Sequence, residues 1–199
     1  LTPSSVSTTS LTLSWTDASS NEDSFIVSYG TDGSTYPTTV TTTAANVSTT
    51  GVSSLTPNTL YYFIVVASNG SGTATSTAVS TTTLAAVPTD FTASAVSTSQ
   101  INLSWSSTNP SGSVYEIRDS GDTLIATTTV TSYSVTGLSE NTSYTYKVRT
   151  QQTGAPSTYS AYSATASDTF FFSLFKSLFK LSMSALITFC FSSLVDSLS

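Results

Sequence analysis

Two copies of one corner-and-strand pattern constrain this chain more than any other feature. The stretch Leu55–Ala67 (LTPNTLYYFIVVA) recurs as Leu138–Thr150 (LSENTSYTYKVRT). Each copy has a leucine, a short polar corner and a tyrosine that begins an alternating strand. A buried tyrosine needs a partner for its hydroxyl, so Tyr61 and Tyr144 are expected to bond to the backbone a few residues upstream. The pattern predicts the central strand of a β-sandwich.

A second repeat fixes the number of domains. The segment Leu11–Trp15 recurs as Ile101–Trp105, ahead of the two corners and in the same order. We therefore predict domain 1 at residues 1–84, domain 2 at residues 85–169, and each tryptophan between two sheets. Domain 2 is entered through the segment 87–90 ahead of Phe91. Because Leu1 has no such lead-in, we expect the amino terminus of domain 1 to be truncated.

The matching residues resemble fibronectin type III domains. They are the strand B tryptophans Trp15 and Trp105, the strand C segments 25–29 and 115–119, and the two corners. The resemblance implies an all-β chain of two tandem seven-stranded sandwiches with immunoglobulin-like topology. Such domains occur in extracellular hydrolases and adhesins of bacteria. The resemblance therefore implies an extracellular or cell-surface location, with a polysaccharide or a cell-surface protein as a distant partner.

Composition excludes several kinds of chemistry. Charged residues make up only 8% of the chain, and the net charge of −6 argues against nucleic-acid binding, which needs a basic surface. The chain has no histidine, which excludes the usual serine and cysteine catalytic arrangements, and its one cysteine, Cys190, precludes an intrachain disulfide. The acidic pairs Glu22/Asp23 and Asp119/Asp122 fall in predicted connections and supply too few oxygens for calcium. We expect neither an enzyme nor a cofactor or metal site.

The outward faces of the two domains are predicted to differ. Alternation from Tyr61 turns four apolar residues of domain 1 outward, as a candidate interaction patch: Ile26, Tyr62, Ile64 and Val66. The corresponding strands of domain 2 place Glu116, Arg118, Thr145, Lys147 and Arg149 outward, a pattern typical of solvated cross-strand ion pairs. The apolar set is either a contact surface or a consequence of strand propensity.

The last segment, 170–199, has a different composition. Its first part has polar residues along one helical stripe and phenylalanine and leucine opposite, which predicts a hydrophobic helical tail. Three interpretations remain open: a membrane-spanning or interfacial anchor, a helix packed on the sandwich, or read-through into non-coding sequence.

The function predicted from these features is that of a non-catalytic spacer or interaction module in a larger secreted or cell-surface protein. Its partners would be the neighbouring domains that it presents or docks. One alternative is a receptor-like ectodomain with the tail as membrane anchor. Another is an accessory segment of an extracellular polysaccharide-degrading enzyme.

Overall fold

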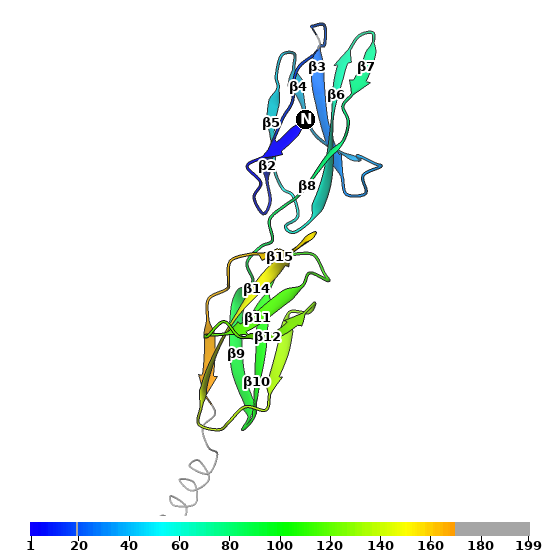
Figure 1. The fold of residues 1–199 in the computed structure, drawn as a ribbon. Helices are drawn as coiled ribbons and strands as arrows, with labels where there is room; N and C mark the ends of the chain where they lie inside the picture. Colours follow the sequence, from blue (N-terminus) through cyan, green and yellow to red (C-terminus); the bar gives the residue numbers. More distant parts are fainter. Residues whose placement is uncertain (19, 170–199) are drawn as a thin grey trace, which may run out of the picture.

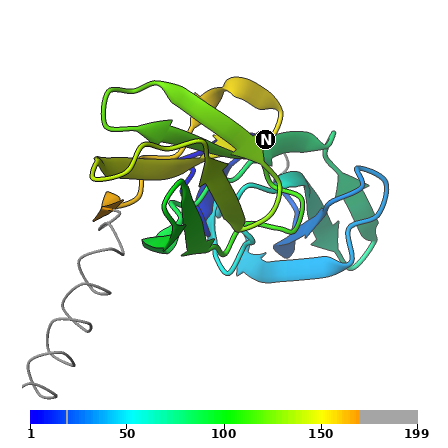
Figure 2. The same ribbon diagram turned by 90° about the horizontal axis from the view of Figure 1, so that it is seen from below.

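Two β-sandwiches lie end to end in the computed structural model, which describes residues 1–18 and 20–169 (Figure 1). Figure 2 looks along the pair, with the green-to-orange strands of domain 2 in front of the blue-to-cyan strands of domain 1. These ranges contain no helix, and hence none long and apolar enough to span a membrane. The predicted tail at 170–199 lies outside the described residues.

Domain 1 consists of two antiparallel sheets. One sheet has the order β1-β2-β5, and the other has the order β4-β3-β6-β7 with β8 also paired to β6. The strands are β1 (Thr2–Ser4), β2 (Leu11–Ser14), β3 (Ser24–Gly30), β4 (Thr38–Ala44), β5 (Thr49–Val52), β6 (Leu60–Asn69), β7 (Gly72–Thr75) and β8 (Val79–Thr82).

Domain 2 repeats this arrangement. Its sheets have the orders β13-β10-β9 and β12-β11-β14-β15, with β16 also paired to β14. The strands are β9 (Thr89–Ser97), β10 (Gln100–Ser106), β11 (Tyr115–Asp119), β12 (Leu124–Thr128), β13 (Ser132–Thr136), β14 (Ser143–Gln152), β15 (Ala155–Tyr159) and β16 (Ala166–Thr169). The predicted all-β, tandem-sandwich fold is confirmed, and in each domain the seventh strand of the plan is divided into two segments.

Each sandwich has its own apolar core between its sheets. Leu13, Val27 and Phe63 are fully buried in domain 1, as are Ile117 and Val148 in domain 2. Their alternation with half-buried residues along β3, β6 and β14 follows the predicted period of two. Burying one side chain of this size contributes about 1.5–3 kcal/mol. Each domain therefore has the apolar interior that a chain without an intrachain disulfide requires.

The two tryptophans differ in their surroundings. Trp105 is only 6% exposed and belongs to the core of domain 2, with its ring 5.4 Å from that of Tyr115. Trp15 is half-buried and packs against the domain 1 core, with its ring 5.5 Å from that of Phe25. The predicted position between the sheets is thus realised fully at Trp105 and only in part at Trp15.

Candidate interaction surfaces

The predicted apolar patch lies on one face of the sheet that contains β3 and β6. Ile26 is paired with Val66, and Ile64 and Tyr62 face the same way from β6. All four residues are half-buried, and they alternate with buried neighbours such as Phe63. The loop after β3 closes over one end of the patch, because a Cβ on Gly33 would lie only 3.1 Å from the Tyr62 ring.

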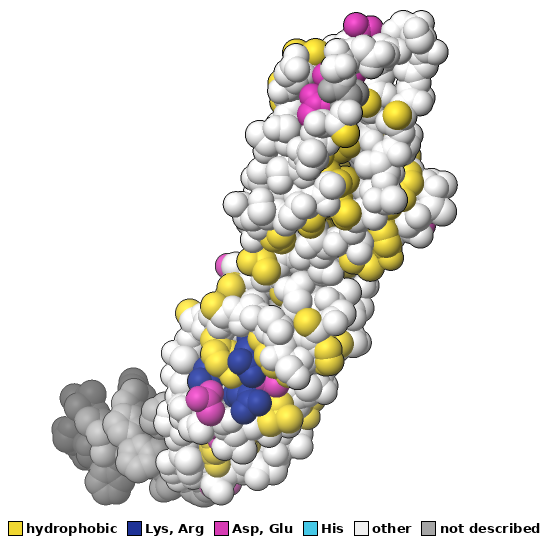
Figure 3. Space-filling view, turned by 45° about the horizontal axis from the view of Figure 1, so that its top comes forward, with side chains coloured by type: hydrophobic (Ala, Val, Ile, Leu, Met, Phe, Trp, Pro, Cys, Tyr) yellow, Lys and Arg dark blue, Asp and Glu magenta, His cyan; other side chains and the backbone are white. Residues whose placement is uncertain are grey.

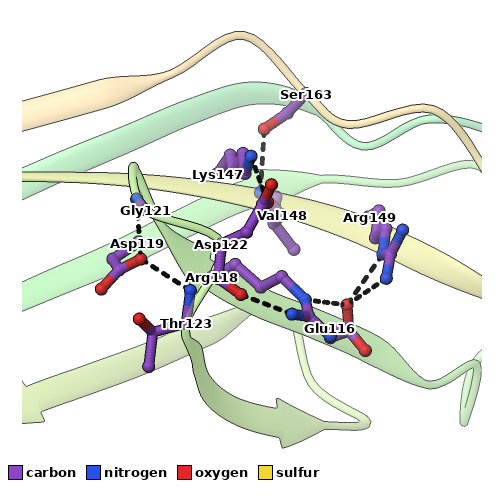
Figure 4. A network of polar contacts seen from close by, with 10 residues as sticks. All are labelled: Glu116, Arg118, Asp119, Gly121, Asp122, Thr123, Lys147, Val148, Arg149 and Ser163. Atoms are coloured by element: carbon purple, nitrogen blue, oxygen red, sulfur yellow. Dashed lines mark hydrogen bonds and ion pairs between the residues drawn. The ribbon is translucent and has the colours of Figure 1, made fainter.

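The matching face of domain 2 carries an ion-pair network (Figures 3 and 4). Glu116 Oε1 accepts from the guanidinium groups of Arg118 and Arg149, each at 2.6 Å in its shortest contact. Lys147 pairs with Asp122 at 2.5 Å. The Arg149 guanidinium lies 3.8 Å from the centre of the Tyr159 ring. These basic side chains therefore have partners within their own domain.

The expectation of solvated ion pairs is wrong at Glu116, which is only 4% exposed. Burial would by itself raise the pKa of its carboxyl group, but the hydrogen bonds from Arg118 and Arg149 outweigh that effect and the pKa is lowered. The two guanidinium groups cover the carboxylate. The network therefore includes a desolvated charge whose compensation depends on its partners.

The junction between the domains is made by polar side chains that sequence reasoning did not single out. Asn58, in the domain 1 corner, is 3% exposed and has a left-handed backbone with φ of 52°. Its side-chain amide donates to Gln151 O at 3.1 Å, and its side-chain oxygen accepts from Thr153 N at 2.7 Å. The corner of domain 1 is thereby bonded to the β14–β15 hairpin of domain 2.

Two further amides bind the segment that joins the domains. Gln152 donates to Thr83 O and accepts from Ala85 N, both at 2.8 Å. Asn109 accepts from Ala86 N at 2.8 Å and donates to Ala86 O at 2.9 Å. Gln152 and Asn109 are 9% and 8% exposed. The connection is therefore held along its backbone by domain 2.

A groove of about 350 Å³ lies beside the half-buried indole of domain 1. Its lining includes Leu1, Trp15, Phe25, Val65, Ala67 and Ala74. Leu1 and Trp15 adjoin β1 and β2 of one sheet, and the other four residues belong to strands of the second sheet. Because Phe25 and Val65 are core residues, the groove opens onto the apolar core. Sequence reasoning did not predict this groove.

The acidic pairs considered above have local structural partners. Asp23 accepts from Gly70 N at 3.1 Å, and Glu22 accepts from Asn46 N at 3.3 Å. Asp119 accepts from the backbone N–H groups of Gly121 and Thr123, at 2.9 and 2.8 Å. Within residues 1–18 and 20–169, no three acidic, histidine or cysteine side chains are grouped as a metal site would require.

Comparison with known families agrees with this geometry. The model of the fibronectin type III domain matches the chain twice, at residues 1–83 and 86–165. The chain belongs to the fibronectin type III family. The two-domain fibronectin type III segment of chicken tenascin superimposes with a TM-score of 0.63, over 84% of this chain and 94% of that segment, at 15% identity. That likeness concerns the fold alone.

Two curated bacterial proteins are similar in sequence. Chitinase A1 of Niallia circulans is 31% identical over 158 residues, and endoglucanase B of Cellulomonas fimi is 34% identical over 163 residues. The alignments cover 72% and 73% of this chain but only 22% and 15% of those proteins. The similarity therefore concerns a small part of each relative.

Proposed function

We propose that this chain is a non-catalytic module of a larger secreted or cell-surface protein, in which it spaces and orients neighbouring domains. The bonded junction carries the proposal. Asn58 joins the two domains directly, and Gln152 uses both its donor and its acceptor on the connecting backbone. Each of these hydrogen bonds contributes about 0.5–1.5 kcal/mol net, so a bend at the junction that breaks them is unfavourable.

The two domains would then fix the relative orientation of the neighbouring domains as well as the distance between them. A flexible linker gives a random-coil separation and no defined angle between its ends. Here the connecting residues Thr83 and Ala85 are buried, with exposures of 0% and 6%, and their backbone groups are bonded to Gln152. A neighbour attached to either end would keep a defined direction relative to the other.

The test is the relative orientation of the two domains in solution. Residual dipolar couplings from the parent protein should fit one alignment tensor for both domains. The double variant Asn58→Gly with Gln152→Ala should need two tensors, because the side-chain bonds across the junction are lost. Glycine is chosen at position 58 because it adopts the left-handed backbone without strain. Independent tumbling of the domains in the parent protein would refute the proposal.

A matched control is available at Asn141. It occupies the same corner position in domain 2, with φ of 55°, and it is exposed rather than buried at the junction. Asn141→Gly should therefore leave the single alignment tensor unchanged. A loss of common orientation in this variant as well would mean that corner flexibility, and not the Asn58 contacts, sets the angle.

The two bacterial relatives support the proposal of a second role. A chitinase and an endoglucanase are polysaccharide-degrading enzymes by name, and the chain matches only a small share of each. We propose that the larger protein is extracellular and acts on or near a polysaccharide, with this chain as an accessory segment. Co-sedimentation with insoluble chitin and with cellulose tests direct contact. Failure to sediment with either would limit the module to spacing.

The apolar patch of domain 1 is proposed as a contact surface for a neighbouring domain of the same polypeptide. Its support is the contrast within the repeat: Ile64 and Val66 stand where domain 2 has Lys147 and Arg149. The same fold thus accommodates charge at these positions, and apolar residues there are not required by the sheet.

A further inference from the structure

The basic residues of the described part of the chain gather on one face of domain 2 (Figure 3). They are Arg118 on β11 and Lys147 and Arg149 on β14. Arg118 is paired with Lys147 across the sheet, and Glu116 is paired with Arg149. Domain 1 contains no arginine or lysine, and it has apolar residues at the positions that match Lys147 and Arg149. The sandwich therefore does not require cations on this face.

The acidic groups beside these cations balance two of the three positive charges. Glu116 accepts from both guanidinium groups through one oxygen, Oε1, and Asp122 is paired with Lys147. Asp119 instead accepts from the backbone of its own hairpin. The three cations and two carboxylates leave a net charge of +1, in a chain whose net charge is −6. We call these five residues the cationic patch: Glu116, Arg118, Asp122, Lys147 and Arg149.

The cations of the patch are held in place but remain accessible. The side chains of Arg118, Lys147 and Arg149 are 25%, 17% and 21% exposed. The Arg149 guanidinium lies 3.8 Å from the centre of the Tyr159 ring and 4.6 Å from that of Tyr162. Within the described residues, protein acceptors engage two of the five N–H groups of each guanidinium. The other N–H groups are available to a ligand, and little side-chain entropy remains to be lost on binding.

We propose that the cationic patch binds a polyuronate, a polysaccharide whose sugar rings carry carboxylate groups. A carboxylate supplies the missing negative charge, and its planar geometry suits the N–H groups of Arg118 and Arg149. Tyr159 and Tyr162 border the site with an apolar ring and a hydroxyl, which match the C–H groups and hydroxyls of a sugar. The inference goes beyond the proposed function, because spacing and orienting domains needs no ligand.

The test is a titration of the full chain with polygalacturonate at about 0.15 M salt, where charges more than about 8 Å apart are largely screened. The chain has two arginines and two tryptophans. In NMR spectra, both arginine Nε–H signals should shift, and both indole N–H signals should stay in place. The methyl ester of the same polymer has the same rings without the charge and should move none of them. Unmoved arginine signals with polygalacturonate would overturn the inference.

Two variants with the same change in net charge locate the site. Asp122→Asn and Glu140→Gln each remove one exposed carboxylate, but Glu140 lies in the corner ahead of β14 and outside the patch. Asp122→Asn should raise the affinity for polygalacturonate about threefold, and Glu140→Gln should leave it unchanged. Lys147→Gln should lower it by a similar factor, and it strands no buried charge because Asp122 is exposed. Equal effects of Asp122→Asn and Glu140→Gln would refute binding at the patch.

Poly-L-glutamate distinguishes a polysaccharide ligand from an acidic protein. It carries carboxylates without sugar rings, so it should bind at least about fivefold more weakly than polygalacturonate of equal charge, since contacts with the tyrosines are lost. Equal or tighter binding of poly-L-glutamate would overturn the assignment to a polysaccharide. Chitin and cellulose are uncharged, so co-sedimentation with them tests the proposed accessory role separately from this site.

Discussion

The hydroxyl oxygen of Tyr61 accepts a hydrogen bond from the backbone N–H of Thr56 at 2.9 Å. Tyr144 makes the same bond with Ser139 N at 3.0 Å, so the same hydrogen bond closes the corner in both domains. The bond fixes the crossover between the sheets, because it ties the start of β6 or β14 to the chain that precedes it. This is the contact that the repeated leucine-to-tyrosine spacing predicted.

Tyr61→Phe should destabilise domain 1 by about 1 kcal/mol, the contribution of one intramolecular hydrogen bond. The ring remains, so packing against Phe63 is kept. Denaturant unfolding followed separately for each domain by NMR measures the change. Tyr144→Phe is the matched variant and should act on domain 2 alone. No change in either domain would mean that water replaces the tyrosine at no cost.

Glu116→Gln should destabilise domain 2 by about 1–3 kcal/mol, because the buried site keeps Arg118 and Arg149 but loses their counter-charge. Asp122→Asn is the control on the same face. The Asp122 side chain is 66% exposed, so this change should have little effect. Equal effects of the two substitutions would show that burial of the Glu116 carboxylate does not increase its contribution to the stability of domain 2.

The ion pairs of Glu116 also predict that the stability of domain 2 decreases at acid pH. Its pKa is lowered in the folded state, so the stabilisation is present above the unfolded pKa and is lost as the pH falls through the folded pKa. The urea midpoint of domain 2 should therefore decrease as the pH is lowered through and below the usual range of carboxyl pKa values. In Glu116→Gln the urea midpoint should decrease less steeply with falling pH. If its pH dependence were unchanged, other carboxyl groups would be responsible for the loss of stability in acid.

The strand pattern could be predicted from the sequence because it depends on local periodicity. Phe63 and Val65 alternate with outward residues, and a shift of one residue would turn the whole set. The tyrosine corner added the register. These two signals were sufficient to predict the sandwich of each domain.

The junction and the buried carboxylate could not be predicted in this way. Asn58 and Gln152 come from different domains, and no period of two or spacing rule links them. The burial of Glu116 depends on two arginines, one of them on the neighbouring strand, that fold over it. The one available signal was Gln151-Gln152, which stands where domain 1 has Ser68-Asn69 and which forms part of the junction.

Tyr146 predicts an alkaline transition confined to domain 2. Burial raises its pKa to about 12 from an ordinary value of 10.0. A raised pKa means that stability is complete below the unfolded pKa and is lost as the pH rises towards the folded value. Domain 2 should therefore weaken between about pH 10 and 12. Tyr146→Phe should reduce this loss of stability at high pH, as measured by the thermal unfolding midpoint of domain 2. Domain 1 has Phe63 at the matching position and is the internal control.

The apolar patch gives the last prediction. Ile64→Lys with Val66→Arg introduces the residues that domain 2 carries at the matching positions, so domain 1 should stay folded with a nearly unchanged melting temperature. Sedimentation velocity should show concentration-dependent association of the parent protein and none of the double variant, because apolar side chains that remain partly accessible on a sheet face favour association. If the double variant associated as the parent protein does, strand propensity alone would explain the apolar residues of the patch. A large loss of stability would instead place these half-buried side chains in the core, since charge on a core position is not tolerated.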